Sequence, residues 1–173
     1  MSCIVGIESD GIVYIGSDSL ASSENDIRHL KEHKTFINGE YLIGFCGSPR
    51  SGQILGPKYL AHPEEPIEEF VDQIKNQLND YNLLIEDNEN SVLSLSNFLI
   101  GYNGNLYQVY NDFYIGQFKE KYTAIGSGES YALGSLYETS KLDISPENRI
   151  RLAIKCASYF CSSVGGKIVI KSM

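Results

Sequence analysis

The sequence contains no tryptophan, and its four cysteines are Cys3, Cys46, Cys156 and Cys161. This number is too small for a disulfide-stabilised scaffold, and none of the four has the spacing of a metal-binding pair. We expect each cysteine to be a small buried side chain, which favours a reducing, cytoplasmic location. No apolar run is long enough to span a membrane, and the first residues lack the basic and apolar regions of a signal peptide.

Positive charge is also scarce. The chain has 14 Lys and Arg residues against 22 Asp and Glu residues, giving a net charge of −8. This balance, without any cluster of basic residues, argues against binding to nucleic acid or to an anionic membrane. A length of 173 residues with 42% hydrophobic and 21% charged residues is typical of one globular domain. We therefore expect a single domain covering residues 1–173.

The most informative stretch is residues 2–18. Two β-branched runs, residues 4–7 and 12–15, are separated by Asp10-Gly11. Asp-Gly between such runs is a strong signal for a β-hairpin. The hairpin would bring Asp18, at the end of the second strand, close to Ser2 at the start of the first. A hydroxyl, a carboxylate and the α-amine of the chain would then share one site.

The remaining pattern predicts the fold class. A second hairpin is expected at residues 34–45, a β-meander at 97–125 and a last strand at 167–170, while helices are expected over 49–60, over 67–81, from 129 and from 146. The polar segments 19–33 and 85–91 are expected to be loops. Hairpins followed by helices in pairs indicate an α+β protein, a four-layer αββα sandwich of two stacked antiparallel sheets covered by helices.

Other kinds of catalytic site have little support. His29, His33 and His62 fall in predicted loops, and no set of convergent zinc ligands is present. Gly126-Ser127-Gly128 could hold a phosphate at a helix start, but Glu129 directly after it would repel an anion. The sequence therefore predicts no metal and no cofactor.

An N-terminal nucleophile needs none of these groups. An α-amine has an ordinary pKa of about 7.7–8.0, so it can act as a general base on the hydroxyl of its own residue. A nearby cation would keep the amine neutral, and a carboxylate would orient that cation. Lys34 and Asp18 can supply these two groups, with Ser2 as the nucleophile.

At this point the motifs resemble those of the proteasome β subunit and bacterial HslV peptidase family of N-terminal nucleophile hydrolases. The matching segments, in order, are Ser2-Cys3-Ile4-Val5-Gly6, Asp10-Gly11, Gly16-Ser17-Asp18, Lys34-Thr35-Phe36, Tyr41 to Gly47, Ile125 to Gly134 and Val164-Gly165-Gly166. Each motif alone is weak, but their order and spacing together are specific. The family has the αββα sandwich that the pattern of elements also predicts.

The resemblance implies a threonine-type peptidase with serine as nucleophile. Removal of Met1 would expose the amine of Ser2, and Lys34, held by Asp18, would lower the pKa of that amine. The resemblance places the oxyanion-binding amide on Gly44 and gives Ser127 a supporting role. Residues that would line the substrate pocket are Ala21, Leu42 and Ile43. Family members form homo-oligomeric stacked rings of six or seven subunits, often fed with unfolded polypeptides by an ATP-dependent unfoldase.

The chain also departs from the family pattern. Ser2 replaces the family's threonine, so the β-methyl group that restricts χ1 is missing. Cys161 stands near the place of an acid that handles protons at the amine, with Ser162 and Ser163 after it. These departures leave two alternatives to a peptidase. One is a catalytically inactive ring-forming homologue that retains Met1, and the other is an amidase acting on small amides.

Overall fold

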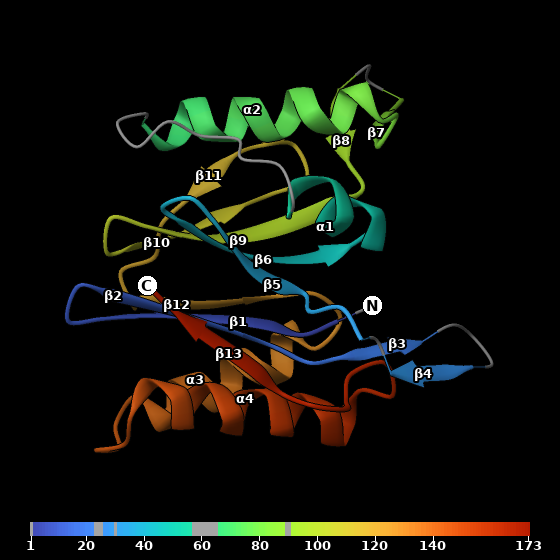
Figure 1. Ribbon diagram of the computed structural model, residues 1–173. Helices are drawn as coiled ribbons and strands as arrows, with labels where there is room; N and C mark the ends of the chain where they lie inside the picture. Colours follow the sequence, from blue (N-terminus) through green and yellow to red (C-terminus); the bar gives the residue numbers. More distant parts are fainter. Residues whose placement is uncertain (1, 23–25, 30, 57–65, 89–90) are drawn as a thin grey trace.

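The structure, a computed structural model, describes residues 2–22, 26–29, 31–56, 66–88 and 91–173. These residues form four layers, in the order helices, sheet, sheet, helices (Figure 1). The helices are α1 (Pro49–Leu55) and α2 (Ile67–Asp80) on one outer face, and α3 (Glu129–Thr139) and α4 (Pro146–Phe160) on the other. The predicted αββα sandwich is therefore confirmed.

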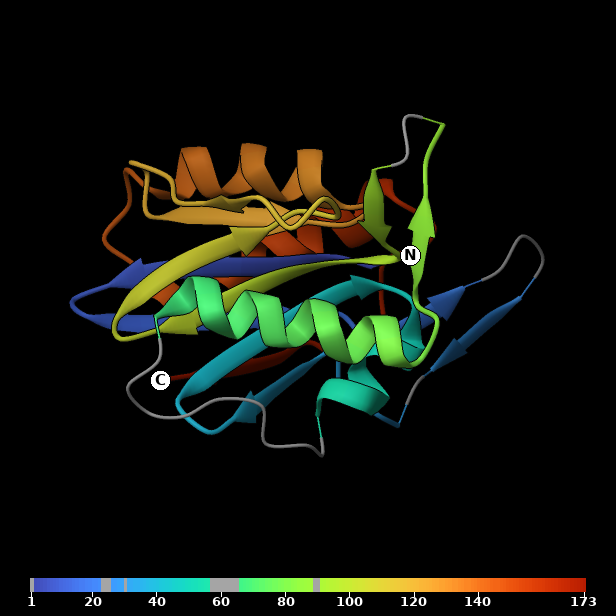
Figure 2. The same ribbon diagram turned by 90° about the horizontal axis from the view of Figure 1, so that it is seen from above.

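The two central layers are antiparallel sheets. The four-stranded sheet has the order β12 (Tyr122–Ile125), β1 (Ile4–Ser9), β2 (Ile12–Ser17) and β13 (Val169–Ser172). The five-stranded sheet has the order β11 (Ile115–Gly116), β10 (Asn105–Val109), β9 (Ser96–Tyr102), β6 (Tyr41–Gly47) and β5 (Thr35–Asn38). Seen from above, α2 lies across the five-stranded sheet (Figure 2).

Three apolar layers hold the sandwich together. Between the first helices and the five-stranded sheet, Phe70 stacks on Tyr41 with ring centroids 3.6 Å apart. Between the two sheets, Ile4, Ile15 and Leu42 belong to a second buried cluster. A third cluster lies between the four-stranded sheet and the helices α3 and α4. Burial of these side chains is the main favourable term in folding.

The opening hairpin forms as the sequence predicts. Asp10 and Gly11 both have positive φ angles, 52° and 75°, as a tight turn that matches the strand twist requires. The register pairs Ile4 with Ser17. Asp18 therefore follows directly beside Cys3, and the amide of Asp18 donates to the carbonyl of Cys3 at 3.2 Å.

Some element predictions were wrong or only partly right. Two short hairpins lie in or next to the segments expected to be loops. Strands β3 (Leu20–Ser22) and β4 (Ile27–His29) pair in the first segment, and β7 (Leu84–Glu86) and β8 (Val92–Ser94) pair around the second. Helix α1 ends at Leu55, and residues 57–60 of the helix predicted over 49–60 lie outside the described residues. Helix α2 ends one residue before the predicted Tyr81. The helix beginning at Pro146 is capped as expected, because the Ser145 hydroxyl accepts a hydrogen bond from the amide of Asn148.

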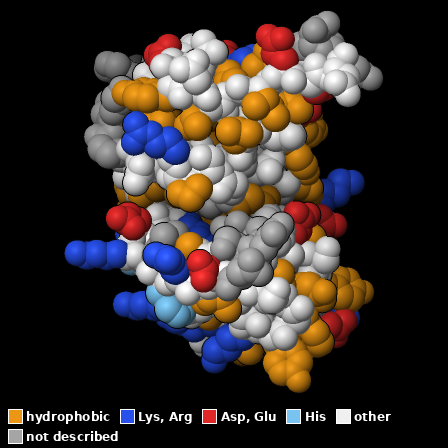
Figure 3. Space-filling view, turned by 90° about the vertical axis from the view of Figure 1, so that its right-hand side faces the viewer, with side chains coloured by type: hydrophobic (Ala, Val, Ile, Leu, Met, Phe, Trp, Pro, Cys, Tyr) orange, Lys and Arg blue, Asp and Glu red, His pale blue; other side chains and the backbone are white. Residues whose placement is uncertain are grey.

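Three exposed aromatic side chains contact one another at the ends of α3 and α4. Tyr159 is 84% exposed and Phe160 is 62% exposed, and their rings meet edge to face. The ring of Phe160 also stacks on Tyr131. Hydrophobic side chains gather over this helical layer in Figure 3, at its lower right.

None of the helices in the described part of the chain combines the length and apolar character that crossing a membrane requires.

Candidate active site

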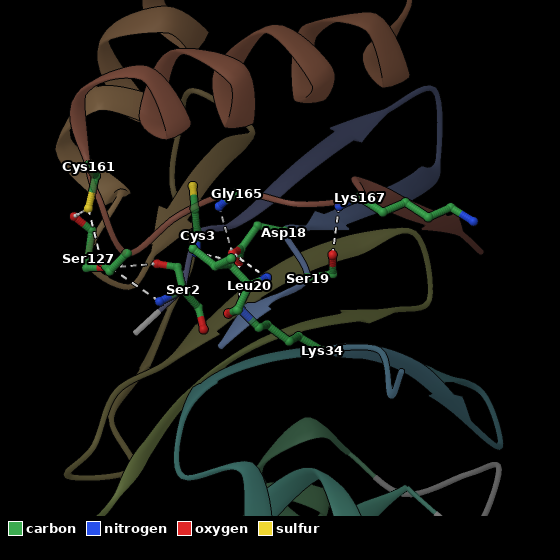
Figure 4. Close-up of polar contacts among 11 residues, drawn as sticks. Ser2, Cys3, Asp18, Ser19, Leu20, Lys34, Ser127, Cys161, Gly165 and Lys167 are labelled. Carbon is green, nitrogen blue, oxygen red and sulfur yellow. Dashed lines mark hydrogen bonds and ion pairs between the residues drawn. The ribbon is translucent and has the colours of Figure 1, made fainter. Parts of the chain in front are cut away.

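The carboxylate of Asp18 is the centre of the candidate site, and it is buried at 1% exposure. Its Oδ1 atom accepts from Lys34 Nζ at 2.8 Å and from the amide of Cys3 at 3.0 Å. Its Oδ2 atom accepts from the amides of Leu20 and Gly165, both at 3.2 Å. Figure 4 shows these groups converging on Asp18 from separate parts of the chain. Four donors satisfy the lone pairs of a buried carboxylate, as burial of its charge requires.

The ammonium group of Lys34 is held in a fixed position. Lys34 directly precedes β5 and is 6% exposed. Besides Asp18, its Nζ atom donates to the carbonyl oxygen of Leu20 at 2.7 Å. A buried charge is tolerated when it is paired and hydrogen-bonded, and both conditions hold here.

Ser2 lies just before β1 and is clasped by the loop that joins β12 to α3. The Ser2 carbonyl accepts from the amide of Gly128 at 3.3 Å and from the Ser127 hydroxyl at 3.2 Å. The Ser2 nitrogen donates to Ser127 Oγ at 3.3 Å. Gly126 has a φ of +98°, and a Cβ atom there would lie 2.3 Å from the Ser2 carbonyl oxygen. Only glycine therefore allows the loop to approach Ser2 this closely.

Two further polar side chains adjoin Ser127. The hydroxyls of Ser127 and Ser163 are 2.8 Å apart. The Cys161 sulfur lies 3.2 Å from Ser163 Oγ and donates to the carbonyl of Ser127 at 3.6 Å. Cys161, which was expected near the place of an acid in the HslV family, is thus connected to Ser2 through the hydroxyl groups of Ser163 and Ser127.

A cavity of about 200 Å³ opens beside these residues. Its lining includes Ser2, Lys34, Ala21, Cys46 and Gly47. Ser2, Lys34 and Ala21 therefore lie together at the cavity. Asp18 and Ser127 do not line it, but Asp18 contacts Lys34 and Ser127 contacts Ser2. Met1 lies outside the described residues.

The structure contradicts the assignment of the oxyanion-binding amide to Gly44. The amide of Phe45 donates to the carbonyl of Lys34, so this edge of β6 forms hydrogen bonds with β5. Amides alternate in direction along a strand, and Gly44 therefore points its amide toward β9, where it pairs with Leu99. A Cβ atom on Gly44 would lie 2.7 Å from side-chain atoms of both Ile4 and Ile15. Gly44 serves close packing between the two sheets.

Gly47, the last residue of β6, is the glycine that reaches the cavity. By the same alternation, the amide of Gly47 points in the same direction as the amide of Phe45. Because Gly47 lies beyond the first residue of β5, its amide points toward the cavity. Its φ angle is +113°, and a Cβ atom would lie 2.2 Å from the carbonyl oxygen of Leu95. The hairpin was expected to end at residue 45, and the signal that sequence reasoning missed is that the strand continues to Gly47.

Leu42 and Ile43 do not line the cavity either. Both are 0% exposed. Successive side chains of β6 alternate between its faces, so Leu42 packs between the sheets and Ile43 packs under α1 and α2. Of the three predicted pocket residues, the structure places only Ala21 at the cavity.

The four cysteines do not share one environment. Cys3 and Cys46 are buried, as expected, and burial raises the pKa of Cys3 to about 12 and that of Cys46 to about 11. Cys156 and Cys161 are partly exposed, so the expectation of burial is wrong for them. Desolvation acts to raise the pKa of Cys161, but hydrogen bonds from Ser163 and Ser127 outweigh it and lower that pKa below its usual value.

No group of three or more His, Cys, Asp or Glu side chains in the described ranges is arranged to hold a metal ion. His29 and His33 lie on the surface, and His62 is outside the described residues. The polar side-chain groups that line the cavity are the hydroxyls of Ser2 and Ser22, the paired ammonium group of Lys34 and the thiol of Cys46.

The structure is a sandwich of two stacked antiparallel sheets between helices, with the N-terminal segment at one end. The sequence matches no protein-family model and no curated protein. Solved structures do match. Thiobacillus denitrificans BPH is 23% identical with a TM-score of 0.84, covering 99% of this chain and 97% of that one. The same protein in complex with epoxomicin is 22% identical, with a TM-score of 0.83.

Two more distant structures have the same fold. Eukaryotic HslV from Trypanosoma brucei is 17% identical with a TM-score of 0.70, and 98% of each chain is covered. The Anbu (Gly-1) mutant from Hyphomicrobium sp. strain MC1 is 14% identical with a TM-score of 0.68. The match covers 98% of this chain and 80% of that one. The predicted resemblance to HslV is therefore confirmed at the level of the fold.

Replacing Asp18 by Asn should destabilise the protein strongly, because the ammonium group of Lys34 would stay buried without its counter-charge. We expect a loss of roughly 3–5 kcal/mol in the free energy of unfolding, measured by urea denaturation. The control is Glu138→Gln, which breaks the exposed pair with Lys141 and should cost about 1 kcal/mol or less. Equal losses in the two variants would contradict the central role of Asp18.

The buried thiols should make the fold sensitive to alkali. Cys3 and Cys46 ionise near 9.0 when unperturbed, but only at about 12 and about 11 in the folded protein. Above pH 9 the unfolded state binds fewer protons, so stability should fall as pH rises toward 11, by up to about 1.4 kcal/mol per pH unit for each thiol. Urea unfolding over this range should show a weaker pH dependence in a Cys3→Ala/Cys46→Ala variant. An unchanged slope would show that other groups cause the effect.

Proposed function

We propose that the protein is a proteasome-like endopeptidase in which Ser2, after removal of Met1, is the nucleophile for hydrolysis of peptide bonds. The observation that carries the proposal is that Ser2, Lys34 and Gly47 line one cavity while Asp18 holds Lys34 in place. A nucleophile, a fixed cation and a backbone amide are the groups that acyl transfer requires.

The reaction would run in two halves. The α-amine of Ser2 takes the hydroxyl proton as Ser2 Oγ attacks the carbonyl carbon of the substrate. The amide of Gly47 stabilises the oxyanion, a contact worth about 2.7–4 kcal/mol in other enzymes. The proton then passes to the leaving amine, and an acyl group remains on Ser2. Water hydrolyses this ester by the reverse proton route and regenerates the free hydroxyl.

Lys34 and Ser127 would tune the base. The positive charge of Lys34 near the amine disfavours its protonated form and so keeps it available to accept a proton. Ser127 Oγ, 3.3 Å from the Ser2 nitrogen, fixes the direction of the amine. Asp18 acts through Lys34, because its Oδ1 atom fixes the ammonium group at 2.8 Å. Ala21 would contact the substrate side chain next to the scissile bond.

We further propose that copies of the chain form stacked rings of six or seven subunits in the cytoplasm, which enclose the cavities and admit unfolded polypeptides with the help of an ATP-dependent unfoldase. The shared fold with HslV supports this assembly. The exposed aromatic cluster of Tyr131, Tyr159 and Phe160 also supports it, because exposed apolar patches commonly mark interaction sites.

Replacing Ser2 by Ala in protein freed of Met1 should abolish peptide hydrolysis, since no hydroxyl remains to attack. Ser2→Thr should hydrolyse faster than the natural chain, because the added methyl group restricts χ1 of the nucleophile. The measurement is cleavage of unfolded casein, with mass spectrometry of the Ser2 peptide after incubation with epoxomicin, the compound bound to BPH in its structure.

The control variant is Ser9→Ala, which removes a hydroxyl at the other end of β1 and should leave activity unchanged. Hydrolysis by Ser2→Ala at the natural rate would rule out the proposed nucleophile. Complete retention of Met1 together with no labelling would favour an inactive homologue. Hydrolysis of small amides without cleavage of peptides would favour an amidase.

Electron microscopy of the purified protein should show closed rings. The reason is that an isolated protomer would leave both the cavity and the aromatic cluster open to solvent. Analytical ultracentrifugation over a range of protein concentrations gives an independent measure of mass. A monomer under all conditions would contradict the enclosed-peptidase proposal but would leave the chemistry of Ser2 to be judged by the labelling experiment.

A further inference from the structure

Another cavity, of about 330 Å³, lies at the edges of the two sheets, beside α3. Its lining comes from β10, β12, the loop between β11 and β12, and α3. Strands β11 and β12 are the outermost strands of their sheets, so the sandwich is open on this side. The volume is typical of pockets that hold small ligands or single side chains. The proposed catalytic cycle makes no use of this cavity.

Aromatic rings line this cavity. They belong to Tyr110, Phe118, Tyr122 and Tyr137. The face of such a ring attracts a cation. Two of these rings already show this attraction within the chain. The Cζ atom of Arg149 lies 5.3 Å from the ring centroid of Tyr122, and Lys141 Nζ lies 4.3 Å from that of Tyr137. Neither Arg149 nor Lys141 lines the cavity, so neither fills it.

Two carboxylates, of Glu120 and Glu129, face the same cavity. Neither has a hydrogen bond or an ion pair with another side chain in the described part of the chain. Lys119 and Lys121, which flank Glu120, line a different cavity, and Lys121 is paired with Glu8. Burial raises the pKa of Glu129. A half-buried carboxylate without a counter-charge favours a positively charged occupant.

Helix α3 sets the spacing between charge and ring. Glu129, Leu133 and Tyr137 are four residues apart and therefore lie on one face of the helix. All three line the cavity. An alkyl chain that ends in a positive charge matches this order, because its apolar part can pack on Leu133 while the charge meets Glu129. Lysine and arginine side chains have this form.

A buried amide group distinguishes a peptide from a free amine as the occupant. Gln108 lines the cavity and is 5% exposed. Its Oε1 atom accepts from the Thr123 hydroxyl at 2.7 Å. Its Nε2 atom has no hydrogen-bond partner among the residues that the structure describes. A buried donor of this kind needs an acceptor, and the backbone carbonyl of a peptide supplies one next to a basic side chain.

The cavity lies within reach of a peptide bound at Ser2. Thr123, in its lining, pairs with Gly6, which is four residues after Ser2. At about 3.3 Å per residue the separation is roughly 13 Å, or about four residues of an extended peptide. Glu129 is nearer to the active site, because its charge acts on Cys46, a residue of the Ser2 cavity.

We propose that this cavity is a second binding site for the polypeptide substrate, which takes the side chain of a lysine or arginine within about four residues of the bond that Ser2 cleaves. Glu129 pairs with the cation, the aromatic rings surround it, and Gln108 Nε2 donates to a carbonyl of the same peptide. The role in substrate selection rests on the function proposed above. Recognition of a basic side chain is a property of the cavity itself.

The first test does not depend on catalysis. The peptide acetyl-Ala-Arg-Ala-amide is titrated into the protein, and its binding is followed by saturation-transfer NMR, which observes the ligand. The control ligand has citrulline in place of arginine, which keeps the shape of the side chain and removes its charge. Both titrations are repeated with Glu129→Gln, with Tyr137→Leu and with Glu147→Gln.

We expect the natural protein to bind the arginine peptide about 10-fold more tightly than the citrulline peptide, the effect of one charged hydrogen bond. Glu129→Gln should lose this preference, and Tyr137→Leu should bind the arginine peptide about 3-fold more weakly. The matched control is Glu147→Gln, which removes the first-turn acid of α4 instead of that of α3 and should keep the preference. Equal binding of the two peptides, or a preference that survives in Glu129→Gln, would overturn the proposal.

The second readout is the hydrolysis of longer peptides that carry a single arginine at successive positions on either side of the cleaved bond. We expect kcat/KM at one position to be about 10-fold higher with arginine than with citrulline. Glu129→Gln should lose this difference and Glu147→Gln should keep it. Cleavage that does not depend on the arginine at any position would refute the substrate site. A protein that cleaves no peptide would refute the proposed function, while the binding titration would still decide whether the cavity takes a basic side chain.

Discussion

The carboxylate of Asp18 is the interaction on which the fold and the candidate site both depend. It joins the amides of Cys3, Leu20 and Gly165 with the ammonium group of Lys34. Without Asp18 the three amides would lose this acceptor and the ammonium group of Lys34 would lose its counter-charge. The same bonds that fix the ends of several strands therefore also fix the distance between Lys34 and the N-terminal segment. The stability of the fold and the geometry of the candidate site are not separable at this point.

The strand β6 divides two roles between neighbouring residues. Its middle is covered on both faces, so Leu42, Ile43 and Gly44 are packing residues. Its end passes the edge of the sheet, and Gly47 therefore reaches the cavity. The resemblance to the HslV family identified the strand but not the residue, because two glycines three positions apart both suit the motif. The direction of a backbone amide depends on strand register, which the sequence does not reveal.

Where sequence reasoning succeeded, a local rule fixed the geometry. The turn at Asp10-Gly11 sets the register of β1 and β2, and that register alone places Asp18 beside the start of β1. Lys34 was proposed as the cation that an N-terminal nucleophile needs, in a position that the resemblance to the family also indicated, and the structure brings it within 2.8 Å of that carboxylate. The fold class followed from the alternation of hairpins and paired helices. These inferences needed no knowledge of contacts between distant segments.

Where it failed, the signal was weak or non-local. The hairpin β3–β4 is short, and its second strand is exposed throughout, so it lacks the apolar alternation that predicts a strand. The partial exposure of Cys161 depends on how the end of α4 meets the loop around Ser127, which no local pattern encodes. A cysteine is usually buried, and this general tendency gave the wrong expectation.

The hydrogen bond from the amide of Gly165 to Asp18 and the bonds between Ser127 and Ser2 determine when the site can form during synthesis. The first strand pairs with β12, and the hydrogen bonds of the site join residues as far apart as Asp18 and Gly165. A chain emerging from the ribosome therefore holds Ser2, Asp18 and Lys34 long before it holds the segments around Ser127 and Gly165 that contact them. The candidate site therefore closes only after the segment around Gly165 has been synthesised.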